Sequence, residues 1–398
     1  MTDPDSPLRG AHDLPLLFSS APVAPTRPRR RRTGPVLGVV GALVVAGGLA
    51  AAQLGANLNY DDAAERYDAA VQTTRETIAE VRADTDDLQS ATGYASQLIQ
   101  SDDGTLVDSA SKDALAAAVS GAEAAASDAE DVLDSRIPEP GEKPTWFWEL
   151  FAVSDRLADD RDGLDDLADD LADETPAIDE AQTALSDAGL TLLTTAASTA
   201  AGFEAAHPSA KNDAVIALRD AAAKASAATG IDASAATSLA SLQSAAALVV
   251  SSEQAELAEK AGPLLSKRLE IEAFARSLAP GVLLEFDWNP IVSGAGGSGS
   301  MGGLTTWWWD TPGRAVIELS NSVAERWPSY SSKSLVAHEV GHAISVKCED
   351  MYDSSTQDSI EKWATAWAIS MGYTDDANGV WAYGYPPQSY IDAAAGCR

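Results

Sequence analysis

Basic residues are scarce in this chain of 398 residues, where 27 Lys and Arg stand against 60 Asp and Glu, for a net charge of −33. Such an excess of negative charge argues against nucleic acid as a partner and against direct adhesion to anionic lipid. Histidine is scarcer still, with 4 residues. A chance pair of histidines at a metal-binding spacing is therefore improbable.

Charge is absent from one N-terminal stretch. No residue between Gly34 and Asn59 is charged, and the run 36–54 is dense in valine, leucine, alanine and glycine. This run is long enough to cross a bilayer as one helix. The arginines at 27 and 29–32 precede it, and positive charge on that side favours a cytoplasmic N-terminus. We therefore expect a disordered cytoplasmic tail over 1–33, a transmembrane signal-anchor helix over 34–58, and an extracytoplasmic body held at the plasma membrane.

A cleaved signal peptide is the alternative interpretation, with Ala50-Ala51-Ala52 as the cleavage site. Its leader would be unusually long and its apolar core too long, which favours the uncleaved anchor.

Only 2 cysteines are present, Cys348 and Cys397, and both follow the anchor. An oxidising compartment favours a disulfide between them, which would tie the chain end to the region around Cys348. Two unpaired thiols, or Cys348 as a metal ligand, are the alternatives.

Alanine, aspartate and glutamate dominate the sequence after Tyr60 and predict long helices. Apolar and small residues recur at steps of four and three from Tyr60 to Ile99, a weak heptad seam. We expect a helical hairpin or coiled-coil stalk over 59–137, a Pro/Gly linker over 138–145 and a helical bundle over 146–279. This half carries no catalytic constellation, so we expect it to act as a spacer, to form homo-oligomers or to bind a partner in the cell envelope.

The composition changes again from Pro280. Two segments, 282–288 and 315–320, have the composition of strands, and a glycine-rich segment, 293–303, lies between them. The glycine-rich segment is either a mobile flap or a simple connection. A small α+β domain over 280–398 is predicted, so the fold class is mostly α with this domain at the C-terminus.

The clearest chemical signal is the segment Ala337-His338-Glu339-Val340-Gly341-His342-Ala343, with the pattern H-E-x-x-H. Residues four apart share one face of a helix, so His338 and His342 can present two imidazoles to one ion. Catalytic zinc keeps three protein ligands and an open position for water. Glu339, next to His338, is placed to take a proton from that water.

A third ligand is expected downstream, on the segment 356–371, whose apolar residues recur at helical steps. Glu361 lies within this apolar pattern, where burial without a partner would be costly and a zinc ion would be a partner. The alternative is a solvated glutamate on the helix surface. Three further carboxylates are weaker candidates because they sit in the polar connection: Asp350, Asp353 and Asp358.

The two segments His338-Glu339-Val-Gly-His342 and Glu361-Lys-Trp-Ala-Thr-Ala-Trp-Ala resemble the gluzincin branch of zinc metallopeptidases, the thermolysin-like clan. The resemblance covers about the last hundred residues and is specific only in these two helices. It implies a zincin-like fold, Zn²⁺ on His338, His342 and Glu361, Glu339 as general base and acid, and peptide or protein substrates. One departure is Thr365, where thermolysin has an aspartate that supports a zinc-bound histidine.

The same resemblance implies two further roles. The strand before the metal-binding helix pairs with extended substrate in such enzymes, and 315–320 has that place in the chain. A donor to the developing oxyanion would come from one of the tyrosines after the ligand helix, and the turn Gly384-Tyr385-Pro-Pro387 favours Tyr385. The other candidates are Tyr373, Tyr383 and Tyr390, and all four can equally be packing residues.

A different class of function competes with the peptidase. The chain can be an anchored helical scaffold whose C-terminal zinc domain is structural or inactive, and Thr365 favours this alternative. Glu339 opposes it, as does the rule that structural zinc usually has a fourth Cys or His ligand.

Overall fold

The computed structural model describes the backbone from Gly34 to Arg398 and the side chains from Val45 onward. The predicted cytoplasmic tail, 1–33, lies outside the described residues. The predicted anchor, 34–58, falls at the start of the first helix, but its side chains before Val45 also lie outside them.

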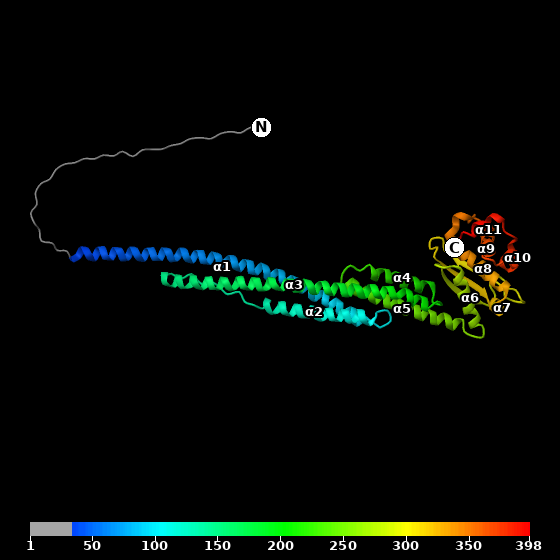
Figure 1. The fold of residues 1–398 in the computed structure, drawn as a ribbon, viewed down its shortest axis with the longest axis horizontal. Helices are drawn as coiled ribbons and strands as arrows, with labels where there is room; N and C mark the ends of the chain where they lie inside the picture. Colours follow the sequence, from blue (N-terminus) through cyan, green and yellow to red (C-terminus); the bar gives the residue numbers. More distant parts are fainter. Residues whose placement is uncertain (1–33) are drawn as a thin grey trace, which may run out of the picture. The chain divides into compact units, whose positions relative to one another are not determined.

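Helices make up most of the described chain, as predicted (Figure 1). The six that precede the sheet are α1 (Gly34–Ser101), α2 (Ser109–Leu133), α3 (Phe147–Ala206), α4 (Asn212–Ser226), α5 (Ala233–Glu259) and α6 (Leu265–Leu278).

The described residues form two compact units. The first contains the part of α1 up to Ala69 together with Pro138–Arg161, and the second contains Ala70–Ile137 and Asp162–Arg398. The predicted helical ranges 59–137 and 146–279 are each divided between the units, because α1 and α3 continue from one into the other.

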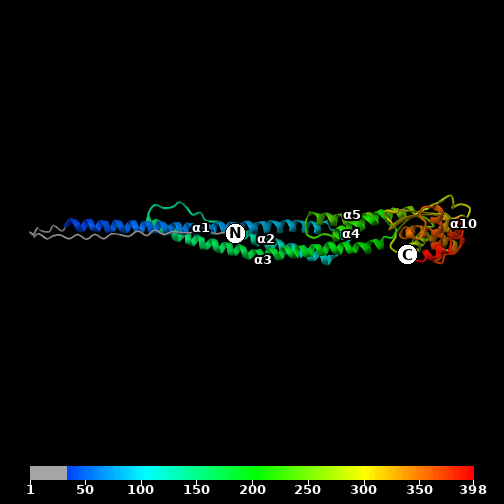
Figure 2. The same cartoon turned by 90° about the horizontal axis from the view of Figure 1, so that it is seen from above.

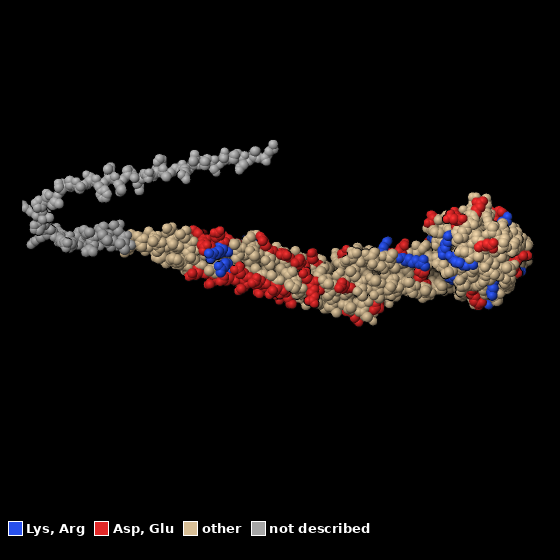
Figure 3. Space-filling view, turned by 45° about the horizontal axis from the view of Figure 1, so that its top comes forward, with Lys and Arg blue, Asp and Glu red and all other residues tan. Residues whose placement is uncertain are grey.

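Long helices form here because apolar residues return every seven positions. In α3 such a series is fully or nearly fully buried, which is the pattern of a helix packed along its length on other helices: Leu150, Leu157, Leu164, Leu171, Ile178, Leu185 and Leu192. The aspartate pairs between them, such as Asp165-Asp166 and Asp169-Asp170, are exposed. Figure 3 shows Asp and Glu side chains along the helical part of the chain, as expected for a solvated face.

A hydrophobic cluster in the second unit joins residues of α1, α2, α3, α4 and α5. Helices α4 and α5 lie side by side, as Figure 2 also shows. Among the described residues, α5 is the one helix long and apolar enough to cross a membrane, with 39% of its apolar window buried. Its buried apolar residues belong to the hydrophobic cluster, and core helices pass the same test, so this is weak evidence for a membrane span.

A three-stranded sheet opens the C-terminal domain. Its strands are β1 (Leu283–Asn289), β2 (Gly303–Trp307) and β3 (Arg314–Ser320), in the order β1-β3-β2. Strand β3 runs parallel to β1 and antiparallel to β2. The prediction that 315–320 offers an edge to substrate is therefore wrong, because β3 is hydrogen-bonded on both sides and β2 is an edge strand.

The elements that follow the sheet cover it and end the chain (Figure 1). They are α7 (Asn321–Arg326), α8 (Tyr330–Ser345), the 3₁₀ turn η1 (Val346–Met351), α9 (Gln357–Ser370), the 3₁₀ turn η2 (Asp376–Asn378), α10 (Val380–Tyr383) and α11 (Gln388–Ala394). Helix α8 contacts the sheet, α6 and α9, so it lies in the middle of the domain.

The predicted disulfide between Cys348 and Cys397 is confirmed. It joins η1 to the end of the chain, and both cysteines are buried. Trp367 of α9 is also fully buried and donates from Nε1 to the Cys397 backbone oxygen over 2.9 Å. The C-terminal tail is thus fixed to the same helix that carries Glu361.

The helical part of the second unit contacts the sheet through polar side chains. Asn212, at the start of α4, donates from its backbone N to Glu285 Oε2 over 2.9 Å and from Nδ2 to the Ala315 oxygen over 3.0 Å. A buried ion-pair group connects the end of α5 to α6. In this group Lys260 Nζ lies 3.1 Å from carboxylate oxygens of both Glu256 and Glu272. The Lys260–Glu272 pair ties α6 to the end of α5, and α8 packs against α6.

Candidate metal centre

Helix α8 places the H-E-x-x-H residues in the interior of the domain. It begins at the cap residue Ser329, whose hydroxyl accepts from the Ser332 backbone N–H over 3.2 Å. Every residue from Ser334 to Ser345 is buried, because the helix lies between the sheet and α9. Polar side chains in such a position need partners, since burying an unpaired polar group costs several kcal/mol, roughly 2–7.

Helix α9 brings Glu361 to the same place. The two helices approach closely at Gly341, where a Cβ would lie 2.8 Å from the Ala364 backbone oxygen and 3.0 Å from its Cα. No side chain larger than hydrogen fits there without separating the helices. The glycine inside the H-E-x-x-H segment is thus a packing requirement of the site.

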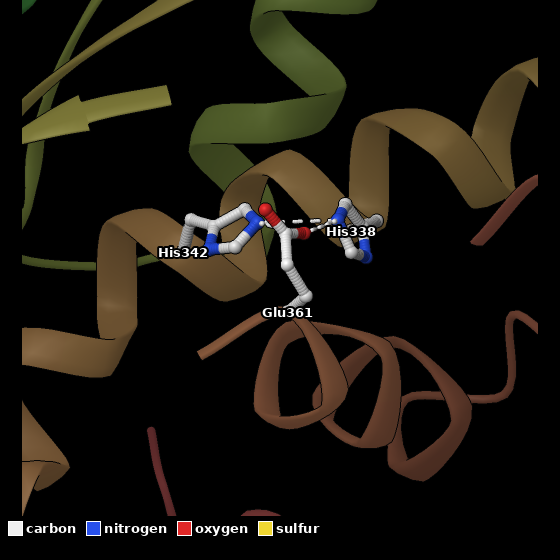
Figure 4. A group of neighbouring side chains, drawn as sticks. All are labelled: His338, His342 and Glu361. Carbon is white, nitrogen blue, oxygen red and sulfur yellow. Dashed lines mark hydrogen bonds and ion pairs between the residues drawn. The ribbon is translucent and has the colours of Figure 1, made fainter. Parts of the chain in front are cut away.

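Three side chains converge between these helices, as Figure 4 shows. His338 Nε2 lies 3.2 Å from Glu361 Oε2, His342 Nε2 lies 3.1 Å from the same oxygen, and the two Nε2 atoms are 3.1 Å apart. All three residues are buried. This arrangement of two imidazoles and one carboxylate could hold a metal ion.

The weaker ligand candidates are occupied elsewhere. Asp353 accepts from the Ser355 backbone N–H over 3.0 Å, and Asp358 pairs with Lys362 over 2.7 Å. Asp350 is exposed. Of the predicted carboxylates, the structure brings Glu361 to the histidines.

Glu361 is held ready to act as a ligand. Burial acts to raise the pKa of its carboxyl, but hydrogen bonds to His338 and His342 and their positive charge outweigh burial and hold that pKa well below its ordinary value. The group is therefore an ionised carboxylate, which is the form that coordinates metal.

Thr365 orients His338. Its hydroxyl donates to the Glu361 backbone oxygen over 2.9 Å, which leaves the oxygen lone pairs free to accept from His338 Nδ1, 3.3 Å away. With Nδ1 protonated, and with a metal bound in place of the Nε2 proton, the Nε2 lone pair would be directed at the metal position.

Gly379 packs against His338 on the side of the ring that carries Nδ1, where Thr365 also lies. Its φ is +102°, and a Cβ there would lie 2.4 Å from Thr365 Oγ1 and 2.7 Å from His338 Nδ1. Sequence reasoning missed this residue, although Asn378-Gly379 is a typical turn signal. The loop after α9 therefore packs its backbone directly on the histidine and its supporting hydroxyl.

His342 is held mainly by stacking. The ring of Trp307, the last residue of β2, lies parallel to the imidazole within 8°, with the ring centroids 5.3 Å apart. Nδ1 of His342 is buried and has no hydrogen-bond partner among the described residues. The orientation of this ring therefore depends on Trp307 and on the contact with Glu361.

Glu339 is directed toward β2. Thr305 Oγ1 lies 2.7 Å from Glu339 Oε2, and a Cβ on Gly303 would lie only 2.3 Å from Oε1. Burial raises the pKa of Glu339, and the charge of His338 and the Thr305 hydrogen bond oppose that rise. An edge strand with a glycine and a threonine at these positions makes room for the carboxylate and orients it.

Tyr383, rather than Tyr385, lies against the site. Its ring is parallel to that of His338 within 10°, at 6.0 Å between centroids. Burial, followed by the negative charges of Glu361 and Glu339, raises the pKa of Tyr383 to about 12. Tyr385 is 67% exposed.

The two remaining tyrosine candidates have packing roles. Tyr390 shares a hydrogen bond with Ser359 over 2.7 Å, and Tyr373 packs edge-on against Phe274.

No protein family, curated protein or solved structure matches this chain.

Proposed function

We propose that this chain is a membrane-anchored zinc metallopeptidase of gluzincin type, whose domain 280–398 hydrolyses peptide bonds outside the plasma membrane. The observation that carries the proposal is the convergence of His338, His342 and Glu361 with Glu339 beside them. It is the residue set of the H-E-x-x-H pattern plus a glutamate from the next long helix.

The donor set fits zinc. Zinc binds imidazole nitrogen and carboxylate oxygen at about 2.0–2.2 Å, and tetrahedral ligands at such distances lie roughly 3.3–3.6 Å from one another. The three donor atoms here lie 3.1–3.2 Å apart, about 0.1–0.2 Å below the lower end of that range. Three protein ligands also leave one coordination position for water, as catalytic zinc sites do. When bound, the ion would supply Lewis acidity for water activation and for polarising a carbonyl.

Glu339 supplies the proton chemistry. In the proposed reaction its carboxylate takes a proton from the attacking water and returns it to the leaving amine, so the C–N bond breaks with no net change in Glu339. Thr305 holds the carboxylate in place, as its hydrogen bond to Oε2 shows. In this proposal Tyr383 donates a hydrogen bond from its phenol to the developing oxyanion, because its ring lies against that of His338.

The substrate enters as an extended strand in this proposal. Strand β2 is an edge of the sheet, and it carries both Thr305 and Trp307, which contact Glu339 and His342. A peptide that pairs with the edge of β2 through backbone hydrogen bonds would pass beside the metal position. Recognition of backbone shape before side-chain sequence follows from this mode of binding.

The uncharged run 34–58, with arginines before it, serves as the membrane anchor. The helical region then acts as a spacer, which can also bind a second copy or another envelope protein. The acidic surface of the body makes nucleic acid an unsuitable partner.

A structural or inactive metal site in an anchored scaffold is the second candidate. It is favoured by the low exposure of the four groups, which lies between 4% and 8%. It is opposed by the three-ligand set and by Glu339, a buried carboxylate adjacent to the site with no ligating role.

The test is hydrolysis of a diverse peptide library by the detergent-solubilised full chain. Wild type should cleave peptides, and Glu339→Gln should retain its metal but lose about 100-fold or more in rate, because a general base is removed. Glu325→Gln, a change of the same kind at an exposed position, is the matched control and should cleave normally. A wild-type chain that holds metal and cleaves no peptide would favour the structural site.

A further inference from the structure

An exposed aromatic cluster marks the start of α3. Trp146 and Trp148 are 56% and 55% exposed, and their rings stack with centroids 5.3 Å apart and planes within 4°. Phe147 packs edge-on against Trp148 at 5.0 Å, and Phe151, one turn further, is 43% exposed. Large aromatic side chains gathered in water are uncommon and mark a contact surface.

The segment that leads to this cluster runs back along α1. The Tyr67 hydroxyl donates to the Pro138 oxygen, Lys143 Nζ lies 2.6 Å from Asp61, and Gln53 Nε2 donates to the Thr145 oxygen over 3.0 Å. These contacts all lie within the first compact unit. They place Trp146 beside the level of Gln53 on α1.

The distance along α1 from the start of the uncharged run to Gln53 is about the thickness of the bilayer's hydrocarbon core. From Gly34 to Gln53 is 53 − 34 = 19 residues, or about 28 Å of helix at 1.5 Å per residue. The hydrocarbon core of a bilayer is about 30 Å thick. The aromatic cluster therefore stands where α1 would leave the hydrocarbon.

The surroundings of the cluster fit a membrane boundary. On α1, four large apolar side chains are more than half exposed: Val45, Leu49, Leu54 and Leu58. The first charges after the uncharged run are Asp61 and Asp62, two turns beyond Gln53. The cluster thus lies beside the apolar surface of α1, and the exposed Glu149, next to Trp148, begins the charged surface of α3. Such a change from apolar to charged surface is the polarity gradient of a lipid interface.

We propose that Trp146 and Trp148 insert into the interfacial layer of the bilayer at its outer face and fix the depth of α1 and the start of α3. An indole has an apolar ring and one N–H donor, so it is most stable at the level of the headgroups, where both are satisfied. The linker 138–145 then lies at the membrane surface, and the acidic helices extend from a fixed point. The inference rests on the proposed anchor and not on the proposed peptide hydrolysis.

The experiment uses the full chain reconstituted in phosphatidylcholine vesicles whose lipids carry bromine either near the headgroup or deep in the acyl chains. Bromine quenches nearby tryptophan fluorescence. The chain has 10 tryptophans, and the other eight lie beyond residue 280, so two interfacial indoles give a quenched fraction of at most about one fifth. Shallow bromine should quench more than deep bromine.

A double variant and a matched control assign the signal. Trp146→Phe with Trp148→Phe should abolish the quenching, whereas Trp381→Phe, at a position 88% exposed in the C-terminal domain, should leave the quenched intensity unchanged. Stronger quenching by deep bromine, or quenching that survives in the double variant, would overturn the inference. So would indoles protected from both lipid bromine and aqueous acrylamide, which would indicate that a second copy or another protein covers the cluster.

Flotation with the vesicles separates this inference from the proposed enzyme. A chain that does not float has no anchor and overturns the inference, whatever its peptidase activity. A chain that floats, shows shallow quenching and cleaves no peptide supports the interfacial cluster and refutes only the hydrolysis.

Discussion

Gly341→Ala tests the packing on which the metal centre depends. The added methyl group would lie 2.8 Å from the Ala364 oxygen, whereas ordinary contact begins at 3.4 Å, so α9 must move by 3.4 − 2.8 = 0.6 Å. Glu361 precedes Ala364 by one turn of the same helix and would move with it. Metal sites tolerate ligand displacements of only about 0.2 Å.

The magnitude follows from that displacement. We expect metal affinity to fall about 10–100-fold, the range observed when residues that orient metal ligands are changed. Overpacking should also cost about 1–3 kcal/mol of unfolding free energy. Alanine in a helix restores about 0.5–1 kcal/mol of this relative to glycine.

The assay is competition for zinc between the solubilised full chain and a chromophoric chelator. Gly121→Ala in α2 is the control, because nothing lies within 4 Å of its added methyl group. It should leave zinc affinity unchanged and increase stability by about 0.5–1 kcal/mol. A Gly341→Ala chain that binds zinc as tightly as wild type would refute the role assigned to the close helix contact.

Three further predictions follow from single contacts. Thr365→Val should weaken zinc binding about 10-fold or more by removing the acceptor for His338 Nδ1, and Thr365→Ser should restore it; equal affinity of all three chains would contradict this role. Cys397→Ser opens a bridge across 49 residues and should cost about 4 kcal/mol of unfolding free energy, seen as a lower urea midpoint that reduction of wild type reproduces. Burial raises the pKa of the Glu285 carboxyl in the folded state above its value in the unfolded chain. The folded state therefore binds a proton at this carboxyl more tightly than the unfolded state does. The stability that this proton contributes is lost as the pH rises through the folded-state pKa. Glu285→Gln should therefore gain stability relative to wild type as the pH rises above about 4, the ordinary pKa of a glutamate, and a difference that is constant with pH would show that Glu285 has an ordinary pKa.

The grouping of His338, His342 and Glu361 could be predicted from sequence because its signals are local. His338 and His342 need only the helical repeat, and Glu361 stood out because a carboxylate in an apolar helical pattern needs a partner. The disulfide could be predicted because the chain has only two cysteines and both follow the predicted membrane anchor. Each of these inferences depends on residues close in sequence or on a very small number of candidates.

The residues around this group could not be predicted, because they come from segments that are distant in sequence and meet only in the folded chain. Gly341 and Gly379 are required by atoms of α9 and His338 that come near only in the folded chain. Strand composition locates 315–320 but carries no information on its neighbours, so β3 was taken for an edge. Tyr383 and Tyr385 are two residues apart, and only the path of α10 decides which one contacts His338.

The most direct test of the metal centre is the metal content of the full chain, purified in detergent without added metal and measured by elemental mass spectrometry. Wild type should carry about one zinc per chain. His342→Ala should lose it, and His207→Ala, which removes a histidine paired with Glu253 outside the site, should keep it. A folded wild-type chain without metal, or a His342→Ala chain that retains it, would contradict the proposed centre.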